Sequence, residues 1–187
     1  MNKLIIVTAP SGAGKTTIVH HLLRTFPELA FSVSATNRAQ RPHERDKADY
    51  YFLTTEDFKN NIKKGAFLEY EEVYEGQYYG TLKEELERLW AQGKTIVFDV
   101  DVRGATNIKK AYPDQSLAIF VQPPSPEILF ERLKNRNTET AESLKNRIAR
   151  ATEELTYANK FDQILVNDLL EIALNDAERM VADFLNK

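Results

Sequence analysis

The sequence contains no cysteine among its 187 residues. Disulfide bonds, thiolate metal sites, iron–sulfur clusters and cysteine nucleophiles are therefore excluded together. Glycine and proline are also sparse, at seven residues each, which excludes collagen-like and low-complexity classes. A chain of this length can bury roughly 70% of its unfolded surface, so we expect one compact domain with a real core.

A strong excess of one charge and long apolar runs are absent too. The 25 Lys and Arg residues stand against 28 Asp and Glu residues, for a net charge of -3. This balance argues against polymeric nucleic acid as a partner. No stretch approaches the roughly 20 apolar residues of a membrane span, and the apolar run 4–7 is too short for a signal peptide. We therefore expect a cytoplasmic protein with no membrane partner.

Short apolar runs alternate with helical patterns along most of the chain. We expect strands at 4–7, 31–34, 95–100, 117–121 and 163–166. We expect helices at 16–25, 82–92, 125–135, 141–159 and 169–185. The strand runs are continuously apolar, which is typical of strands covered on both faces in a parallel sheet. The sequence predicts an α/β fold, with a parallel sheet flanked by helices.

A phosphate-binding loop (P-loop) directly follows the first expected strand. The pattern is G-x-x-x-x-G-K-[ST] with alanine in the first position, and it comprises Ala9, Pro10, Ser11, Gly12, Ala13, Gly14, Lys15 and Thr16. The glycines let backbone N–H groups curl into an anion nest, and the next helix adds the positive end of its dipole. Lys15 supplies a charge to the β- and γ-phosphates of a nucleoside triphosphate, and the Thr16 hydroxyl is a candidate Mg²⁺ ligand.

Asp99 stands near the carboxyl end of the expected strand 95–100. In a parallel sheet this end lies beside the P-loop, so Asp99 is a candidate to hold Mg²⁺ directly or through water. A strand-ending aspartate is more often a loop cap, and the neighbouring P-loop is what favours the metal role. The dinucleotide-binding fingerprint fails because Thr17 occupies its third glycine position.

From about residue 4 to residue 185, the chain resembles the guanylate kinase family. The resemblance rests on residues 9–16, 32–38, 41, 44, 49–50, 67–70, 78–81, 99–101, 136–140 and 166–168. It implies an enzyme of purine nucleotide metabolism that uses Mg²⁺ to transfer the γ-phosphoryl group of ATP to GMP, giving ADP and GDP. The usual family residues are Gly, Thr and Asn where this chain has Ala9, Asn37 and Gln77, which concerns fine geometry only.

The resemblance also implies how the chain is divided. The whole of 1–187 would form one P-loop-type domain whose core comprises 1–33, 89–124 and 156–187. A GMP-binding insert would span 34–88, and a mobile lid would span 125–155.

Site residues follow from the same resemblance. The residues implied to bind GMP are Ser34, Arg38, Arg41, Tyr50, Glu69, Tyr79, Thr81 and Asp101. The residues implied to bind ATP are the P-loop, Arg136, and Arg132 with Asn167 at the adenine end. The residues implied to be catalytic are Lys15, Arg38, Arg41, Arg136 and Arg147.

The residue types agree with these roles. Arginine forks bind phosphate oxygens bidentately, and tyrosine hydroxyls donate to the same group. Guanine presents N1–H and a 2-amino group side by side, and a carboxylate flanked by apolar residues, such as Glu69, accepts both. The adjacent Glu71 and Glu72 are expected to be solvated instead.

Blander interpretations stand beside these roles. The loop arginines and Arg132 could be solvated charges, and the tyrosines could fill the core. The chain could also be a phosphopeptide-binding module of the same fold, although such modules usually lose the P-loop lysine. A kinase acting on a sugar phosphate is a third possibility, against which Ser34, Glu69 and Asp101 argue.

Overall fold

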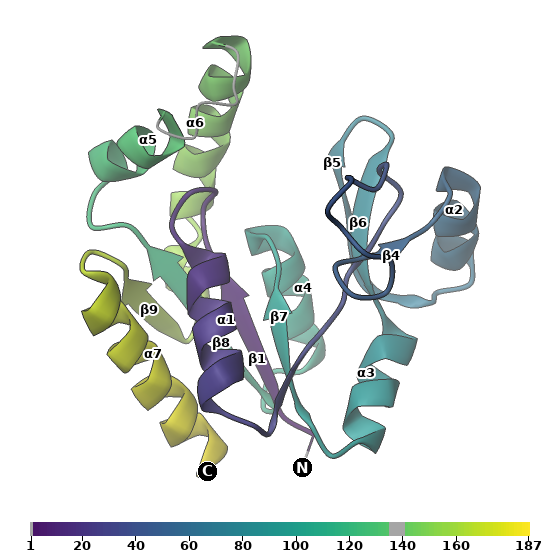
Figure 1. Ribbon diagram of the computed structural model, residues 1–187, viewed down its shortest axis with the longest axis horizontal. Coiled ribbons are helices and arrows are strands. Elements are labelled where there is room, and N and C mark those ends of the chain that lie inside the picture. Colours follow the sequence, from purple (N-terminus) through teal and green to yellow (C-terminus); the bar gives the residue numbers. More distant parts are fainter. Residues whose placement is uncertain (1, 135–140) are drawn as a thin grey trace.

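The main sheet contains five parallel strands. The computed structural model describes residues 2–134 and 141–187, with side chains from 147 onward in the second range. The spatial order of the strands is β2-β7-β1-β8-β9, and every neighbouring pair is parallel. Their bounds are β1 (Leu4–Thr8), β2 (Leu29–Phe31), β7 (Thr95–Asp99), β8 (Ser116–Gln122) and β9 (Gln163–Val166). The predicted parallel α/β fold is confirmed (Figure 1).

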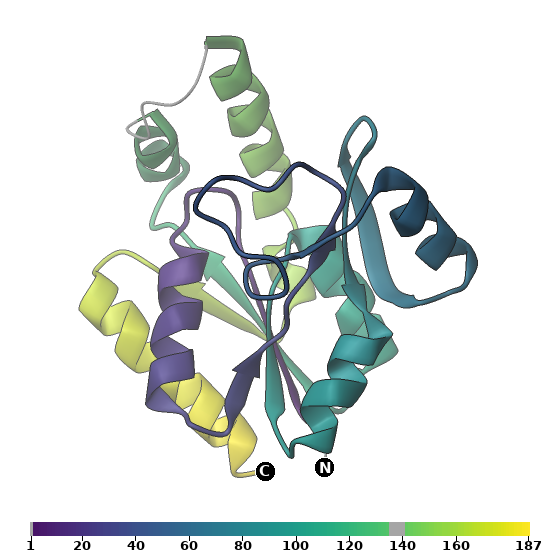
Figure 2. The ribbon, with the colours of Figure 1, turned by 45° about the vertical axis from the view of Figure 1, so that its right-hand side comes forward.

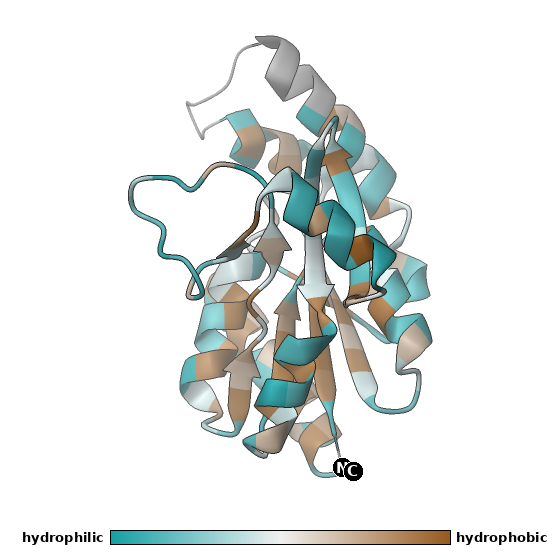
Figure 3. Cartoon of the chain, turned by 90° about the vertical axis from the view of Figure 1, so that its right-hand side faces the viewer, coloured by the Kyte–Doolittle hydropathy of each residue, from teal (hydrophilic) through white to brown (hydrophobic). Residues whose placement is uncertain are grey.

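Helices cover both faces of this sheet. The helices on one face are α1 (Lys15–Thr25) and α7 (Leu170–Leu185), and those on the other are α3 (Lys83–Ala91) and α4 (Val102–Ala111) (Figure 1). Alternate residues of β1 belong to different cores, because Ile5 packs with the α1–α7 side and Ile6 with the α3–α4 side. Both faces therefore demand apolar residues, which explains the continuous apolarity of the strands. Figure 3 shows these strands as hydrophobic segments enclosed by more hydrophilic helices.

The parallel register brings the P-loop and Asp99 together. In β1, Val7 lies opposite Asp99 of β7, and the chain leaves β1 for the P-loop after Thr8. The carboxyl ends of parallel strands share one edge of a sheet, where ligands bind in this fold class. The sequence-distant candidates for phosphate and metal binding thus meet at this edge.

A second, smaller sheet lies beyond that edge. Its strand order is β4-β3-β6-β5, with bounds β3 (Ala35–Thr36), β4 (Tyr51–Phe52), β5 (Phe67–Tyr74) and β6 (Gln77–Leu82). Helix α2 (Thr55–Lys63) covers it through Phe58, whose ring centroid is 4.4 Å from that of Phe67 and 5.5 Å from that of Tyr78. The aromatic residues of this region therefore build a small core of their own.

Two further helices stand on the other side of the P-loop. They are α5 (Pro126–Lys134) and α6 (Ala141–Leu155), followed by the short 3-10 helix η1 (Ala158–Lys160) (Figure 2). The Ser125 hydroxyl accepts a hydrogen bond from the Ile128 N–H at 3.3 Å, as expected for a capping serine before a proline-led helix. Within the described part of the chain, no helix is both long and apolar enough to cross a bilayer.

The predicted strand 31–34 was wrong. Strand β2 ends at Phe31, and the chain crosses to the second sheet, where β3 begins at Ala35. Along the crossing, the Val33 N–H donates to the Glu85 side chain at 3.2 Å rather than to a neighbouring strand. Helices α2 and α4 were not predicted, since α2 buries only Phe58 and α4 contains a glycine in its first turn.

Candidate active site

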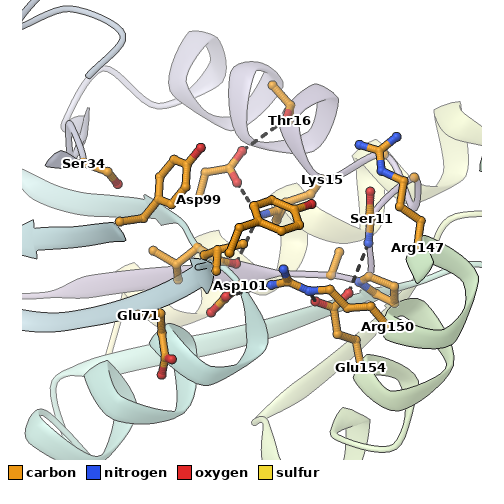
Figure 4. A pocket seen from close by; sticks show the side chains of 18 of the residues that line it. Ser11, Lys15, Thr16, Ser34, Glu71, Asp99, Asp101, Arg147, Arg150 and Glu154 are labelled. Atoms are coloured by element: carbon orange, nitrogen blue, oxygen red, sulfur yellow. Dashed lines mark hydrogen bonds and ion pairs between the residues drawn. The ribbon is translucent and has the colours of Figure 1, made fainter. Parts of the chain in front are cut away.

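A cleft of about 470 Å³ lies between the carboxyl edge of the main sheet, the second sheet and helix α6. Residues of the P-loop, the second sheet, the end of β7 and α6 line it, as Figure 4 shows. The predicted site residues in its wall are Ala9, Pro10, Ser11, Gly12, Gly14, Lys15, Thr16, Ser34, Tyr50, Glu69, Tyr79, Asp99, Asp101 and Arg147. Residues implied for both nucleotides thus face one space.

The P-loop has the backbone that an anion nest requires. Gly12 and Gly14 have φ angles of 92° and 93°, a left-handed conformation that side chains disfavour. Ala13 donates its N–H to the Pro10 carbonyl at 3.1 Å, which closes the turn before α1 begins at Lys15. Ala9 is not among the positive-φ residues, so alanine is tolerated where the family usually has glycine.

Lys15, Thr16 and Asp99 form a charged cluster at the base of the cleft. The Lys15 ammonium pairs with Asp99 and donates to the Val100 carbonyl at 3.0 Å. The Thr16 hydroxyl donates to Asp99 Oδ2 at 3.2 Å, so the two oxygens predicted to hold a metal lie together (Figure 4). Two hard oxygen donors beside a phosphate site fit Mg²⁺, which usually keeps several waters and substrate phosphates as its other ligands.

Asn167 and Arg132 lie behind the P-loop. The Asn167 side-chain amide donates to the Ala13 carbonyl at 2.8 Å, and its nitrogen would collide with any Cβ at Gly14. Arg132 donates twice to the Asn167 carbonyl, at 3.1 Å each. The structure brings these two residues together behind the loop and outside the cleft lining, and their predicted place at the adenine end stays a prediction.

Glu69 lies buried at the opposite end of the cleft. Its side chain accepts a hydrogen bond from the Thr81 hydroxyl at 2.7 Å, and the residue is 8% exposed. Burial raises the pKa of Glu69 to about 7, with a smaller contribution from the charge of Asp101. Asp101 caps α4 by accepting the Gly104 N–H at 2.9 Å. Three of the residues predicted to bind GMP thus lie close together, namely Glu69, Thr81 and Asp101.

Arg38 and Arg41 are not among the residues that line the cleft, and their contact with GMP stays a prediction. Arg38 forms a bidentate pair with Glu44, at 2.7 and 2.5 Å, in which the side chains are only 9% and 8% exposed. The hydrogen bond from Arg38 lowers the pKa of Glu44 to about 2. Arg38 also donates to the Tyr79 hydroxyl at 3.1 Å, so it reaches the cleft through Tyr79. Arg41 is 64% exposed on the loop between β3 and β4.

Three charged residues of the cleft, Glu71, Arg150 and Glu154, were not predicted as site residues. Glu71 lines the cleft and is half-buried, so it is less exposed to solvent than predicted. Arg150 of α6 donates to Asp101 Oδ2 at 3.1 Å and to Glu154 Oε1 at 2.9 Å. Glu154 in turn accepts the Ser11 N–H of the P-loop at 3.3 Å (Figure 4). The signal was available, because 147, 150 and 154 fall on one face of a helix.

The structure describes the side chain of only one of the two arginines predicted to compensate charge during transfer. Arg147 lines the cleft on the same helix as Arg150. Arg136 lies outside the described residues, so its proposed contact with ATP stays a prediction.

Comparisons with known proteins agree with this arrangement. The family model described as guanylate kinase matches residues 1–184. A guanylate kinase from Bacteroides thetaiotaomicron is 50% identical over 99% of this chain and 91% of its own length. One from Porphyromonas gingivalis is 47% identical over 100% of both chains. Among solved structures, guanylate kinase from Anaplasma phagocytophilum superposes with a TM-score of 0.76 at 26% identity, covering 98% of this chain and 87% of that one.

Proposed function

This chain belongs to the guanylate kinase family of nucleoside monophosphate kinases, and on that premise we propose how its cleft performs the family's reaction. A GMP phosphate oxygen attacks the γ-phosphorus of ATP, the bond to the β–γ bridging oxygen breaks, and GDP and ADP leave. The observation that carries the proposal is the shared cleft. A buried carboxylate suited to guanine, Glu69, faces the same space as the P-loop lysine, Lys15.

The guanine end of the cleft selects the acceptor. Ionised Glu69 accepts hydrogen bonds from guanine N1–H and the 2-amino group, while the Thr81 hydroxyl holds one of its oxygens in place. Ser34 and Asp101 complete the base contacts from the same cleft wall. These polar groups favour guanine because adenine offers neither donor at those positions.

The acceptor phosphate is held by hydroxyl groups and cations. Tyr50 and Tyr79 line the cleft and donate hydroxyl hydrogen bonds to the 5′-phosphate. Arg38 orients the Tyr79 hydroxyl, and its charge remains close because its side chain is fixed by Glu44. Arg41 reaches the phosphate when its exposed loop folds over the cleft.

The donor end aligns ATP for transfer. Lys15 and the N–H groups of the P-loop bind the β- and γ-phosphates, supported by the dipole of α1. Arg132 and Asn167 place the adenine end, and Arg136 and Arg147 compensate charge on the moving phosphoryl group. Thr16 and Asp99 would hold Mg²⁺, which neutralises negative charge on the phosphates when bound.

We also propose that the chain is divided into a core, a GMP-binding insert and a lid. The GMP-binding insert at 34–88 contains the whole second sheet, and the lid at 125–155 contains α5 and α6. A cytoplasmic location stays a prediction.

An ADP-release assay tests this function. We expect release with Mg·ATP and GMP, little with AMP, and none with a ribose phosphate. Lys15→Ala should reduce turnover by roughly 10³-fold or more while leaving the circular dichroism spectrum unchanged. Arg179→Ala is the control, since that surface arginine is 71% exposed and lies on α7. If the protein binds phosphopeptides in the absence of nucleotide and releases no ADP in the assay, the alternative of a phosphopeptide-binding module is favoured.

A further inference from the structure

Gly104 occupies a position where a side chain would displace Glu69. It is the third residue of α4 and is buried. A Cβ built there would lie 2.8 Å from Glu69 Oε2, 3.3 Å from Glu69 Cδ and 3.4 Å from Asp101 Oδ1. The space beside this glycine is therefore filled by carboxyl groups of two proposed base readers.

We propose that Gly104 is a positioning residue for acceptor specificity, which sets the place of the Glu69 carboxylate by having no side chain. This inference rests on the proposed function of Glu69 as the guanine reader. It adds a residue that does not touch GMP and that acts only through Glu69.

The backbone of Gly104 does not itself require glycine. The residue lies in an α-helix and is not among the glycines with positive φ. In a helix interior, alanine is intrinsically the more stable residue. The nearest atoms to the built Cβ belong to the two carboxyl side chains and not to the backbone. The contact with Glu69 is thus what glycine at this position permits.

Glu69 is confined from two sides. Thr81 donates to Oε1 at 2.7 Å, and Gly104 leaves room for Oε2. With alanine at position 104, Oε2 would have to retreat by about 0.6 Å to reach ordinary contact, the difference between 2.8 and 3.4 Å. Since a 1 Å misplacement can cost about 10²-fold in rate, a shift of this size predicts a loss of about tenfold.

Gly80 provides a contrasting case. A Cβ there would lie 2.8 Å from the Glu69 backbone oxygen and 2.9 Å from Tyr70 Cβ, in the neighbouring strand β5. Backbone atoms of a paired strand cannot move aside as a carboxylate end can. Gly80→Ala should therefore lower the melting temperature, whereas Gly104→Ala should not.

The test is a double-mutant cycle on acceptor kinetics. We would measure kcat/KM for GMP and AMP, and KM for ATP, in native enzyme, Gly104→Ala, Glu69→Ala and the double variant. Gly104→Ala should lower kcat/KM for GMP about tenfold. It should leave the KM for ATP and the melting temperature unchanged. The double variant should match Glu69→Ala, because the remaining carboxylate, that of Asp101, lies at the ordinary contact distance of 3.4 Å and need not move.

Each outcome assigns the failure to one hypothesis. If Glu69→Ala preserves the GMP-to-AMP ratio, Glu69 is not the reader and the proposed base recognition falls. If Glu69→Ala removes that ratio while Gly104→Ala behaves as native, base recognition stands and the role of Gly104 is wrong. A further loss in the double variant beyond that of Glu69→Ala would show that Gly104 acts other than through Glu69, which also overturns the inference.

Discussion

At the scale of single residues, the proposed mechanism makes the protonation of Glu69 decide which purine the cleft accepts. Burial raises its pKa to about 7, whereas an exposed glutamic acid titrates near 4.5. The ionised carboxylate is only an acceptor and suits guanine N1–H. The protonated carboxyl group gains an O–H donor, which suits the unprotonated N1 of adenine. Specificity should therefore depend on pH.

We predict that kcat/KM for GMP falls as the pH drops below about 7, approaching tenfold per pH unit. The sign follows from the raised pKa, since acid converts the guanine acceptor into a donor. Over the same pH range, the ratio of kcat/KM for GMP to kcat/KM for AMP should decrease. The phosphate of GMP also titrates, at about pH 6. The pH profile of the native enzyme is therefore compared with that of Glu69→Gln, in which only the phosphate titration remains. Superimposable profiles for native enzyme and Glu69→Gln would contradict the assignment.

At the scale of secondary-structure elements, α6 joins the two ends of the cleft. Arg150 contacts Asp101 at the guanine end, and Glu154 contacts the Ser11 N–H of the P-loop. Arg150 also pairs with Glu154, so both contacts depend on one face of one helix. In the proposed mechanism, we therefore expect a movement of α6 to affect the acceptor and donor sites together.

Arg147 and Arg150 should give different kinetic phenotypes. Arg147→Ala should lower kcat by roughly 10³-fold or more with little change in GMP binding, because its charge acts in the transition state. Arg150→Ala should mainly raise KM for GMP, by about tenfold, since Asp101 loses a charged partner. Steady-state kinetics on both variants, with Arg179→Ala as the surface control, measures this. An effect of Arg147→Ala confined to KM for GMP would exclude a transition-state role.

The elements also show what could be predicted from sequence and why. The P-loop was predictable because its residues are contiguous and its glycine spacing has a direct backbone meaning. The three central strands β7, β1 and β8 were predictable because burial on both faces leaves continuous apolar runs. Helix α2 was not, since its single buried side chain, Phe58, gives no apolar stripe.

Contacts between residues far apart in the sequence could not be predicted. The Arg38–Glu44 pair fixes an expected phosphate ligand behind the cleft residue Tyr79, and nothing in the loop's composition indicates that pairing. Arg150 meets Asp101 only after α6 is placed against α4, because 49 residues separate them. The cleft was therefore predictable as a set of residue types, but the partners of its charged side chains were not.

At the scale of the whole molecule, the second sheet and α6 face each other across one cleft. The main sheet lies below both (Figure 2). In the proposed mechanism the two sides bind different substrates. We expect these sides to approach each other when the two phosphates are brought into line. Closure also excludes water and limits wasteful hydrolysis of ATP.

Closure should require both substrates. We expect small-angle X-ray scattering to give a smaller radius of gyration with a bisubstrate analogue that joins adenosine and guanosine through a phosphate chain. GMP alone or ATP alone should produce a smaller change, because each leaves one side of the cleft without its ligand. Equal radii for the free protein and the bisubstrate complex would contradict closure.

The central claim is that Glu69 reads guanine in the cleft that also holds the P-loop, and acceptor discrimination tests it most directly. The measurement is kcat/KM for GMP, IMP and AMP in native enzyme and in Glu69→Gln. IMP keeps N1–H and lacks the 2-amino group, so native enzyme should rank GMP above IMP and IMP above AMP. Glu69→Gln should reduce the GMP value strongly, within the roughly 10⁴-fold that hydrogen-bonding sites achieve, and should change AMP much less. A GMP-to-AMP ratio that survives the substitution would show that another residue reads the base.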